Sequence, residues 1–215
     1  LPGALTRQTA EMLPAASRTD IGQNILAEMA DLSGRPCAGP GGVSSIRDLS
    51  RAVFGQPAPQ IIVLPSTAQA TASLPGNIIV VNRALVEDYE GPEVLAGFLL
   101  IEDLRRRLRD PMLHLLEQSG LMATGRLLTT GEIDDSHLRA HAARLLTTPP
   151  ISVDLPLILA RFERAGVSTE PYAYAIDLTG ESVLDLIEGD PMRGRLRAPL
   201  MTDQTWIALP EICGG

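Results

Sequence analysis

The chain has 215 residues, and 45% of them are hydrophobic, which is enough to bury the core of one ordinary domain or two small ones. This composition excludes a disordered or collagen-like chain, and the longest apolar runs are far shorter than the roughly 20 residues of a membrane-spanning helix. Eighteen basic against 26 acidic residues give a net charge of −8, so we expect no nucleic-acid partner. Every basic residue is an arginine, which excludes lysine-based catalysis and P-loops.

The first quarter of the chain has the pattern of two helices. An amphipathic helix is predicted from Asp20 to Leu32, with Gly34 as its stop. A second, short helix is predicted after Ser44 or Ser45, either of which can cap it, and residues 55–59 have the composition of a linker. We therefore expect residues 1–56 to form a helical segment that packs on a main domain of residues 57–215, as one structural unit.

The middle of the chain contains the strand signals. Two runs rich in isoleucine and valine, Gln60–Leu64 and Asn77–Val81, flank small residues and a Pro-Gly turn, so two or three short strands are predicted. The rest has helical character. Helices are predicted over 83–89 (with Asn82 as cap), 92–109, 111–118, 134–146, 155–165 and 181–187. The expected fold class is α+β, predominantly α, with a small sheet beside a long helix.

The segment from Leu95 to Met112 resembles the active-site helix of the HtpX-type zinc endopeptidases, family forty-eight of the metallopeptidases, whose pattern is roughly L-A-x-x-L-A-H-E-L-G-H-x-x-x-R-H-P. Other pieces are similar to family segments in the same order: residues 74–81 before that helix, residues 155–166 after the third-ligand motif, and residues 34–37 and 211–213 near the two ends. The positions that match the helix pattern are Leu95, Ala96, Leu99, Glu102, Arg109 and Pro111. The resemblance covers most of residues 20–213 and implies a zincin-like fold.

The zinc ligands of that family are absent. The histidine positions of the pattern hold Ile101, Arg105 and Asp110, and the third ligand position falls on Val153, with Asp154 beside it. Aliphatic side chains cannot coordinate zinc, and a protonated guanidinium repels it. Glu102 keeps the position of the general base but would have no metal-bound water to deprotonate. The resemblance therefore implies a catalytically inactive homologue, a pseudopeptidase without zinc or another cofactor.

Arg105 suggests what replaces the metal. A guanidinium at a former ligand position can supply the missing positive charge, so we predict an ion pair of Arg105 with Glu102 or Asp154. The alternative is that the run Arg105, Arg106, Arg107 and Arg109 forms a solvated helix face.

Three histidines leave a second possibility open. His137 and His141 have the i, i+4 spacing of metalloprotease ligands, but Leu138 stands where a general-base glutamate would be. We expect His137 and His141 to be incidental surface residues and His114 to be a partly buried packing residue. The alternative function is an active metallohydrolase with unusual ligands drawn from these histidines and nearby carboxylates.

The leading expectation is a module that binds or regulates a protein or peptide partner. In zincins a strand beside the active-site helix receives the substrate backbone, and by this resemblance Ile78, Ile79, Val80 and Val81 are predicted to offer the edge for peptide addition. The resemblance also implies attachment to a membrane, through a segment outside residues 1–215. A third reading is a purely structural module of a membrane assembly.

Cys37 and Cys213 lie near opposite ends of the chain, far from the spacing of a zinc site. Their placement suggests one disulfide that closes most of the chain, which would favour an extracytoplasmic location.

Overall fold

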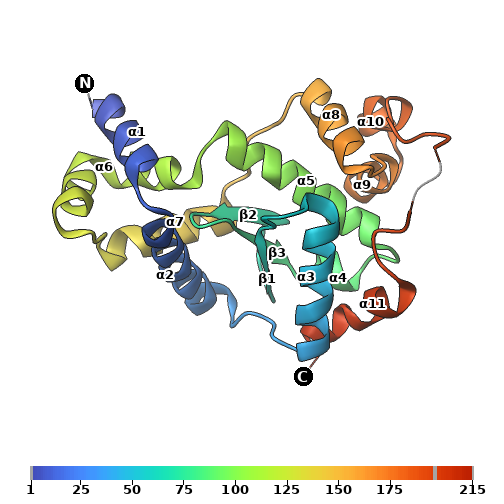
Figure 1. Cartoon of the computed structure of the whole chain (residues 1–215), viewed down its shortest axis with the longest axis horizontal. Helices are drawn as coiled ribbons and strands as arrows, with labels where there is room; N and C mark the ends of the chain where they lie inside the picture. Colours follow the sequence, from blue (N-terminus) through green and yellow to red (C-terminus); the bar gives the residue numbers. More distant parts are fainter. Residues whose placement is uncertain (1, 196–197, 215) are drawn as a thin grey trace.

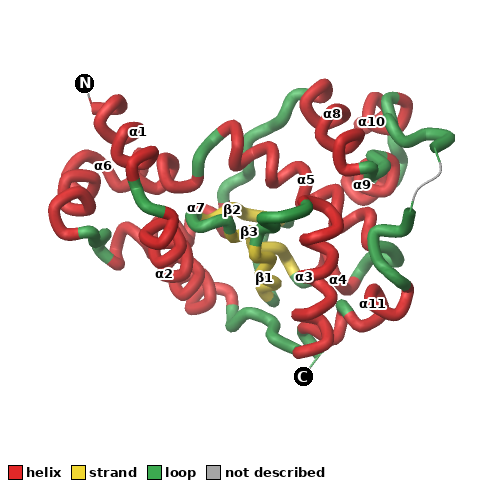
Figure 2. Tube along the Cα trace, viewed as in Figure 1, coloured by secondary structure: helices red, strands yellow, loops and turns green. Residues whose placement is uncertain are grey.

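A three-stranded sheet lies at the centre of the molecule, surrounded by helices on both faces (Figures 1 and 2). The computed structural model describes residues 2–195 and 198–214. Residue 1 of the predicted segment 1–56, and residues 196–197 and 215 of the predicted domain 57–215, lie outside the described part. The chain is mainly helical, so the predicted α+β class with a predominance of helix is confirmed. Among the described residues, no helix is both long enough and apolar enough to cross a membrane.

Three helices precede the sheet. They are α1 (Pro2–Met12), α2 (Ala15–Ser33) and α3 (Pro40–Phe54). The predicted helix over 20–32 contains the buried residues of α2, which begins five residues earlier, and α3 begins at Pro40 rather than at a serine cap. Proline is favoured in the first turn of a helix because its missing N–H has no intrahelical partner there. The sequence prediction lacked α1.

The sheet consists of β1 (Gln60–Leu64), β2 (Thr71–Leu74) and β3 (Ile78–Asn82) in the order β1-β3-β2. Strand β3 pairs in parallel with β1 and antiparallel with β2. The prediction that Ile78, Ile79, Val80 and Val81 form an edge for a peptide is therefore wrong, because these residues form the central strand and both sides of its backbone are paired. An uninterrupted apolar run is typical of a strand that is buried on both faces.

Strand β2 is an edge of this sheet, and the register shows which of its backbone groups are free. The Asn82 N–H donates to the Ala70 carbonyl over 2.9 Å, and bonded pairs alternate along an antiparallel ladder. Ala72 and Leu74 thus face β3, whereas the N–H and C=O groups of Thr71 and Ser73 point away from it. The outer edge of β2 has backbone groups that the sheet does not use.

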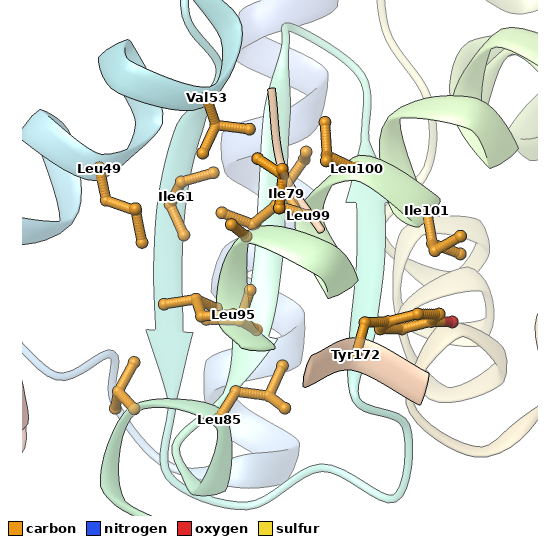
Figure 3. Close-up of a cluster of buried hydrophobic side chains, with 14 of the residues drawn as sticks. Leu49, Val53, Ile61, Ile79, Leu85, Leu95, Leu99, Leu100, Ile101 and Tyr172 are labelled. Carbon is orange, nitrogen blue, oxygen red and sulfur yellow. The ribbon is translucent and has the colours of Figure 1, made fainter. Parts of the chain in front are cut away.

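Each face of the sheet has its own hydrophobic core. Figure 3 shows the core between the sheet, α3 and α5 (Pro92–Leu108), which includes Leu49, Ile79, Leu95 and Ile101. The opposite face packs Ile78 and Val80 against α2, α6 (Pro111–Thr130) and α7 (Asp135–Thr147). The long helix α5 thereby lies directly on one face of the sheet.

The other helices follow the predicted order with local differences. The side chain of Asn82, the predicted cap, accepts a hydrogen bond from the Ala84 N–H over 2.8 Å at the start of the short helix α4 (Ala84–Glu87), which is shorter than the predicted 83–89. Gly120 has a φ of 84° and interrupts α6 just after the predicted end at residue 118. The remaining elements are α8 (Leu155–Ala165), α9 (Glu170–Ile176), η1 (Glu181–Val183), α10 (Leu184–Glu188), α11 (Asp203–Ala208) and η2 (Pro210–Ile212).

Cys37 and Cys213 form a disulfide, as the sequence suggested. Around this bond, Gly39 and Gly42 of the N-terminal segment lie so close to residues 211 and 212 that an added Cβ would clash with them. The segment before the sheet and the end of the chain are thus packed against one another.

Candidate functional site

Glu102 lies on the buried side of α5 and faces the edge strand. Only 5% of the residue is exposed, and both carboxylate oxygens have partners. The Thr71 hydroxyl donates to Oε2 and the Ser73 hydroxyl to Oε1, each over 2.8 Å. Alternate residues of a strand share a face, so Thr71 and Ser73 both reach the same carboxylate.

Arg105 is one helical turn after Glu102 and pairs with it. Its Nη1 lies 3.3 Å from Oε2 of Glu102, and its Nε donates to the Ile151 carbonyl over 3.1 Å. The predicted pairing with Glu102 is therefore confirmed, whereas Asp154 is exposed and has no bond to Arg105 in the described part of the chain. The alternative of a solvated face holds for Arg107 and Arg109 only, since Arg105 and Arg106 are half-buried.

The three positions that the resemblance assigns to zinc ligands do not fit zinc. Ile101 is 2% exposed within the hydrophobic core, Arg105 is a cation paired with Glu102, and Val153 is a half-buried aliphatic side chain. None of the three offers a lone pair to a divalent cation. In addition, no three His, Cys, Asp or Glu side chains among the described residues gather closely enough to hold a metal ion.

A cavity of about 270 Å³ opens next to Glu102. Edge strand β2, the second half of α5, the start of α6 and the end of α7 surround it, and the segment from Thr148 to Ile151 closes one side. Its polar lining consists of Gln69, Thr71, Ser73, Glu102, Arg105, Arg106, Arg109, His114, Gln118, Arg144 and Thr148. The outer edge of β2 thus faces a space that can hold part of another molecule.

Two of the three histidines, His114 and His141, are each hydrogen-bonded to Gln118, which lines this cavity. Gln118 Nε2 lies 2.7 Å from His114 Nε2, and Gln118 Oε1 lies 2.7 Å from His141 Nδ1. An amide nitrogen only donates and an amide oxygen only accepts, so His114 Nε2 accepts and His141 Nδ1 donates. The His141 Nε2 is then a buried acceptor that has no partner among the described groups.

The expectation for His141 was wrong, because this residue is only 1% exposed, whereas His114 is partly buried as predicted. Burial, followed by the charges of His114, Arg144 and Arg109, lowers the pKa of His141 to about 3. Burial and the charge of Arg109 also lower the pKa of His114. Both rings are therefore neutral at pH 7.

Sequence reasoning found Glu102 and Arg105 but missed Thr71, Ser73, Gln118 and Arg144. The polar alternation of Thr71 and Ser73 within an otherwise apolar strand was a usable signal, since it marks a face that meets a polar group. Gln118 and Arg144 carry no such local signal.

No protein-family model matches the chain, and no curated protein matches it in sequence.

Proposed function

We propose that the chain is a catalytically inactive homologue of HtpX-type zinc endopeptidases, with a zincin-like fold, that binds an extended peptide without cutting it. One observation carries this proposal. The outer edge of β2 faces a cavity in which Glu102, at the general-base position, is bonded to Thr71, Ser73 and Arg105. The peptide would add to β2 as a further strand.

The surroundings of Glu102 argue against its use as a general base. A general base must accept a proton from a water molecule, and in zinc peptidases that water is activated by the metal. Here Oε2 accepts hydrogen bonds from Thr71 and Arg105, and Oε1 accepts one from Ser73. Both carboxylate oxygens are thus already occupied by protein donors, and the side chains at the ligand positions do not fit zinc.

Strand addition provides the binding mode. The backbone groups of Thr71 and Ser73 that point away from β3 can each bond to a peptide backbone, and the cavity has room for alternate side chains. An open cavity also favours a binding module over the alternative of a purely structural module, in which large side chains would fill this space. The Cys37–Cys213 disulfide supports an extracytoplasmic location, because disulfides persist in oxidising compartments.

Amide hydrogen exchange tests the binding mode. The probes are two acetylated and amidated hexapeptides, Val-Thr-Val-Gln-Val-Thr and its analogue with Glu in place of Gln. On binding of either peptide, exchange should slow at the amides of Thr71 and Ser73 and stay unchanged at Ala72, whose N–H already faces β3. N-methylation of alternate peptide bonds should abolish binding. Failure of both peptides to bind, or protection confined to other elements, would overturn the proposal.

A second experiment tests inactivity. Zinc per chain is measured after exposure to excess zinc and exhaustive dialysis, together with cleavage of casein by the same sample. We expect negligible zinc and no cleavage. One tightly held zinc per chain with cleavage would instead favour the alternative of a metallohydrolase with unusual ligands, and His114→Gln and His141→Gln would then show which histidines hold it.

A further inference from the structure

Positive charge gathers around the cavity beside β2, although the chain as a whole carries a net charge of −8. Four of the 18 arginines line this cavity, against a single carboxylate, Glu102. The four arginines are Arg105, Arg106, Arg109 and Arg144. The cavity lining therefore carries more positive than negative side chains, whereas the chain as a whole is acidic.

The four arginines differ in how fully they are paired. Arg105 is held by Glu102 and the Ile151 carbonyl, and Arg106 is held by Asp103 and the Asn77 side chain. Among the described residues the Arg109 side chain pairs only with Glu117, at 3.2 Å, and exposed pairs of this kind are weak. Arg144 is exposed and makes no ion pair or side-chain hydrogen bond with any residue that the structure describes. The most weakly paired arginines of the cavity are therefore Arg109, at the end of α5, and Arg144, on α7.

Arg144 also lies near the free edge of the sheet. The Gln69 amide donates to the Thr147 carbonyl over 3.3 Å, which ties the residues before β2 to the last turn of α7. Thr147 is three residues after Arg144, and Arg144, Gln69 and Thr71 line the same cavity. A strand added to β2 would pass close to its guanidinium.

We propose that the occupant of this cavity is an acidic peptide, which rests on the proposed function and specifies its ligand. The peptide backbone pairs with Thr71 and Ser73, and one Asp or Glu side chain is held by Arg144, with Arg109 released from Glu117 as the second donor. Guanidinium groups suit this role because their planar N–H donors match a carboxylate in a bidentate arrangement. The neutral His114 at the cavity wall adds a hydrogen-bonding group without further charge.

Fluorescence anisotropy with the two labelled hexapeptides, the Glu form and the Gln form, tests the ligand class. We expect the Glu peptide to bind about fivefold more tightly than the Gln peptide, a ratio typical of one accessible ion pair. Arg144→Gln should remove this ratio by weakening binding of the Glu peptide alone. Arg47→Gln is the matched control, because Arg47 is exposed on α3, outside the cavity lining, and it makes the same charge change.

Each outcome separates the two proposals. If both peptides bind with equal affinity, or if Arg144→Gln lowers binding no more than Arg47→Gln, the acidic ligand is wrong while strand addition stands. If neither peptide binds, strand addition itself fails. If inorganic phosphate displaces the Glu peptide fully and N-methylation of its backbone has no effect, the cavity is a site for small anions and the peptide inference is overturned.

Discussion

Asp103 and Arg161 are 58 residues apart in the chain, yet Oδ2 of Asp103 lies 2.9 Å from Nε of Arg161. The carboxylate is fully buried and also binds Arg106 and Arg107 of its own helix, at 2.7 and 3.0 Å. Burial alone would raise the pKa of Asp103, but the neighbouring guanidiniums lower it below its ordinary value. Arg161 in turn stacks over the ring of Phe54, so one carboxylate connects α5, α8 and α3.

Asp103→Asn should therefore destabilise the fold substantially. Removal of one partner from a buried ion pair typically costs about 3 kcal/mol, because the remaining charges lose their compensation. Arg107→Gln is the control, since 67% of the Arg107 side chain is exposed and an exposed pair contributes about 0.5 kcal/mol. The free energy of unfolding in urea measures both. Equal effects of the two variants would show that Asp103 does not hold α8 to α5.

The packing of the N-terminal segment can be tested at Gly22 on α2. A Cβ at this position would lie 2.0 Å from the Pro75 carbonyl oxygen, in the turn between β2 and β3. Gly22→Ala is expected to lower the free energy of unfolding by about 2 kcal/mol, since the obstacle is backbone rather than a flexible side chain. Gly125→Ala, within α6 and with open space around it, should stabilise the protein by about 0.5 kcal/mol. Chemical denaturation measures the free energy of unfolding of both variants. If Gly22→Ala leaves it unchanged, α2 does not pack against this turn.

The sequence correctly predicted those helices and strands whose bounds are marked by short-range residue patterns. Strand β1 and helix α8 have the predicted bounds, because each combines a clear apolar pattern with turn residues at its ends. Helix α5 begins at Pro92, as its Gly-Pro start indicated. Short helices such as α9 and α11 were missed, since their seven and six residues are too few to show a periodicity.

Relationships across the chain were harder to predict. The Arg105–Glu102 pair was foreseeable because both residues share one helix turn. The hydroxyls of Thr71 and Ser73, about 30 residues away in the chain, reach Glu102 because strand β2 packs against α5. The position of the edge strand was misassigned for a physical reason. Strand β3 is the more apolar strand because it is central, and edge strand β2 carries the polar residues that face α5.

The Cys37–Cys213 disulfide should contribute strongly to stability. It joins residues separated by 176 positions, and closing a loop of this length lowers the entropy of the unfolded chain by an amount equivalent to about 5 kcal/mol. Cys37→Ser combined with Cys213→Ser should lower the free energy of unfolding by an amount of that order, and a reducing agent should have the same effect on the unmodified protein. Two alkylatable thiols in the folded, untreated protein would contradict the bond.

His141 provides a prediction about pH. Its pKa is about 3 in the folded protein against an ordinary value of 6.5, so between these values the unfolded chain binds a proton that the folded chain does not. The contribution of His141 to stability is therefore complete above pH 6.5 and falls as the pH decreases toward 3, by about 2 kcal/mol at pH 5.

His141→Asn tests this directly, because the Asn side-chain amide can replace Nδ1 as the donor to Gln118 without taking up a proton. Urea unfolding at pH 7 and pH 5 should show a smaller loss for the variant than for the unmodified protein, with the difference close to 2 kcal/mol. Ring resonances of His141 should stay those of a neutral imidazole throughout this range in NMR spectra. If the His141 ring becomes protonated near pH 6 while the protein remains folded, the ring is accessible to water and the pairing with Gln118 does not keep it neutral.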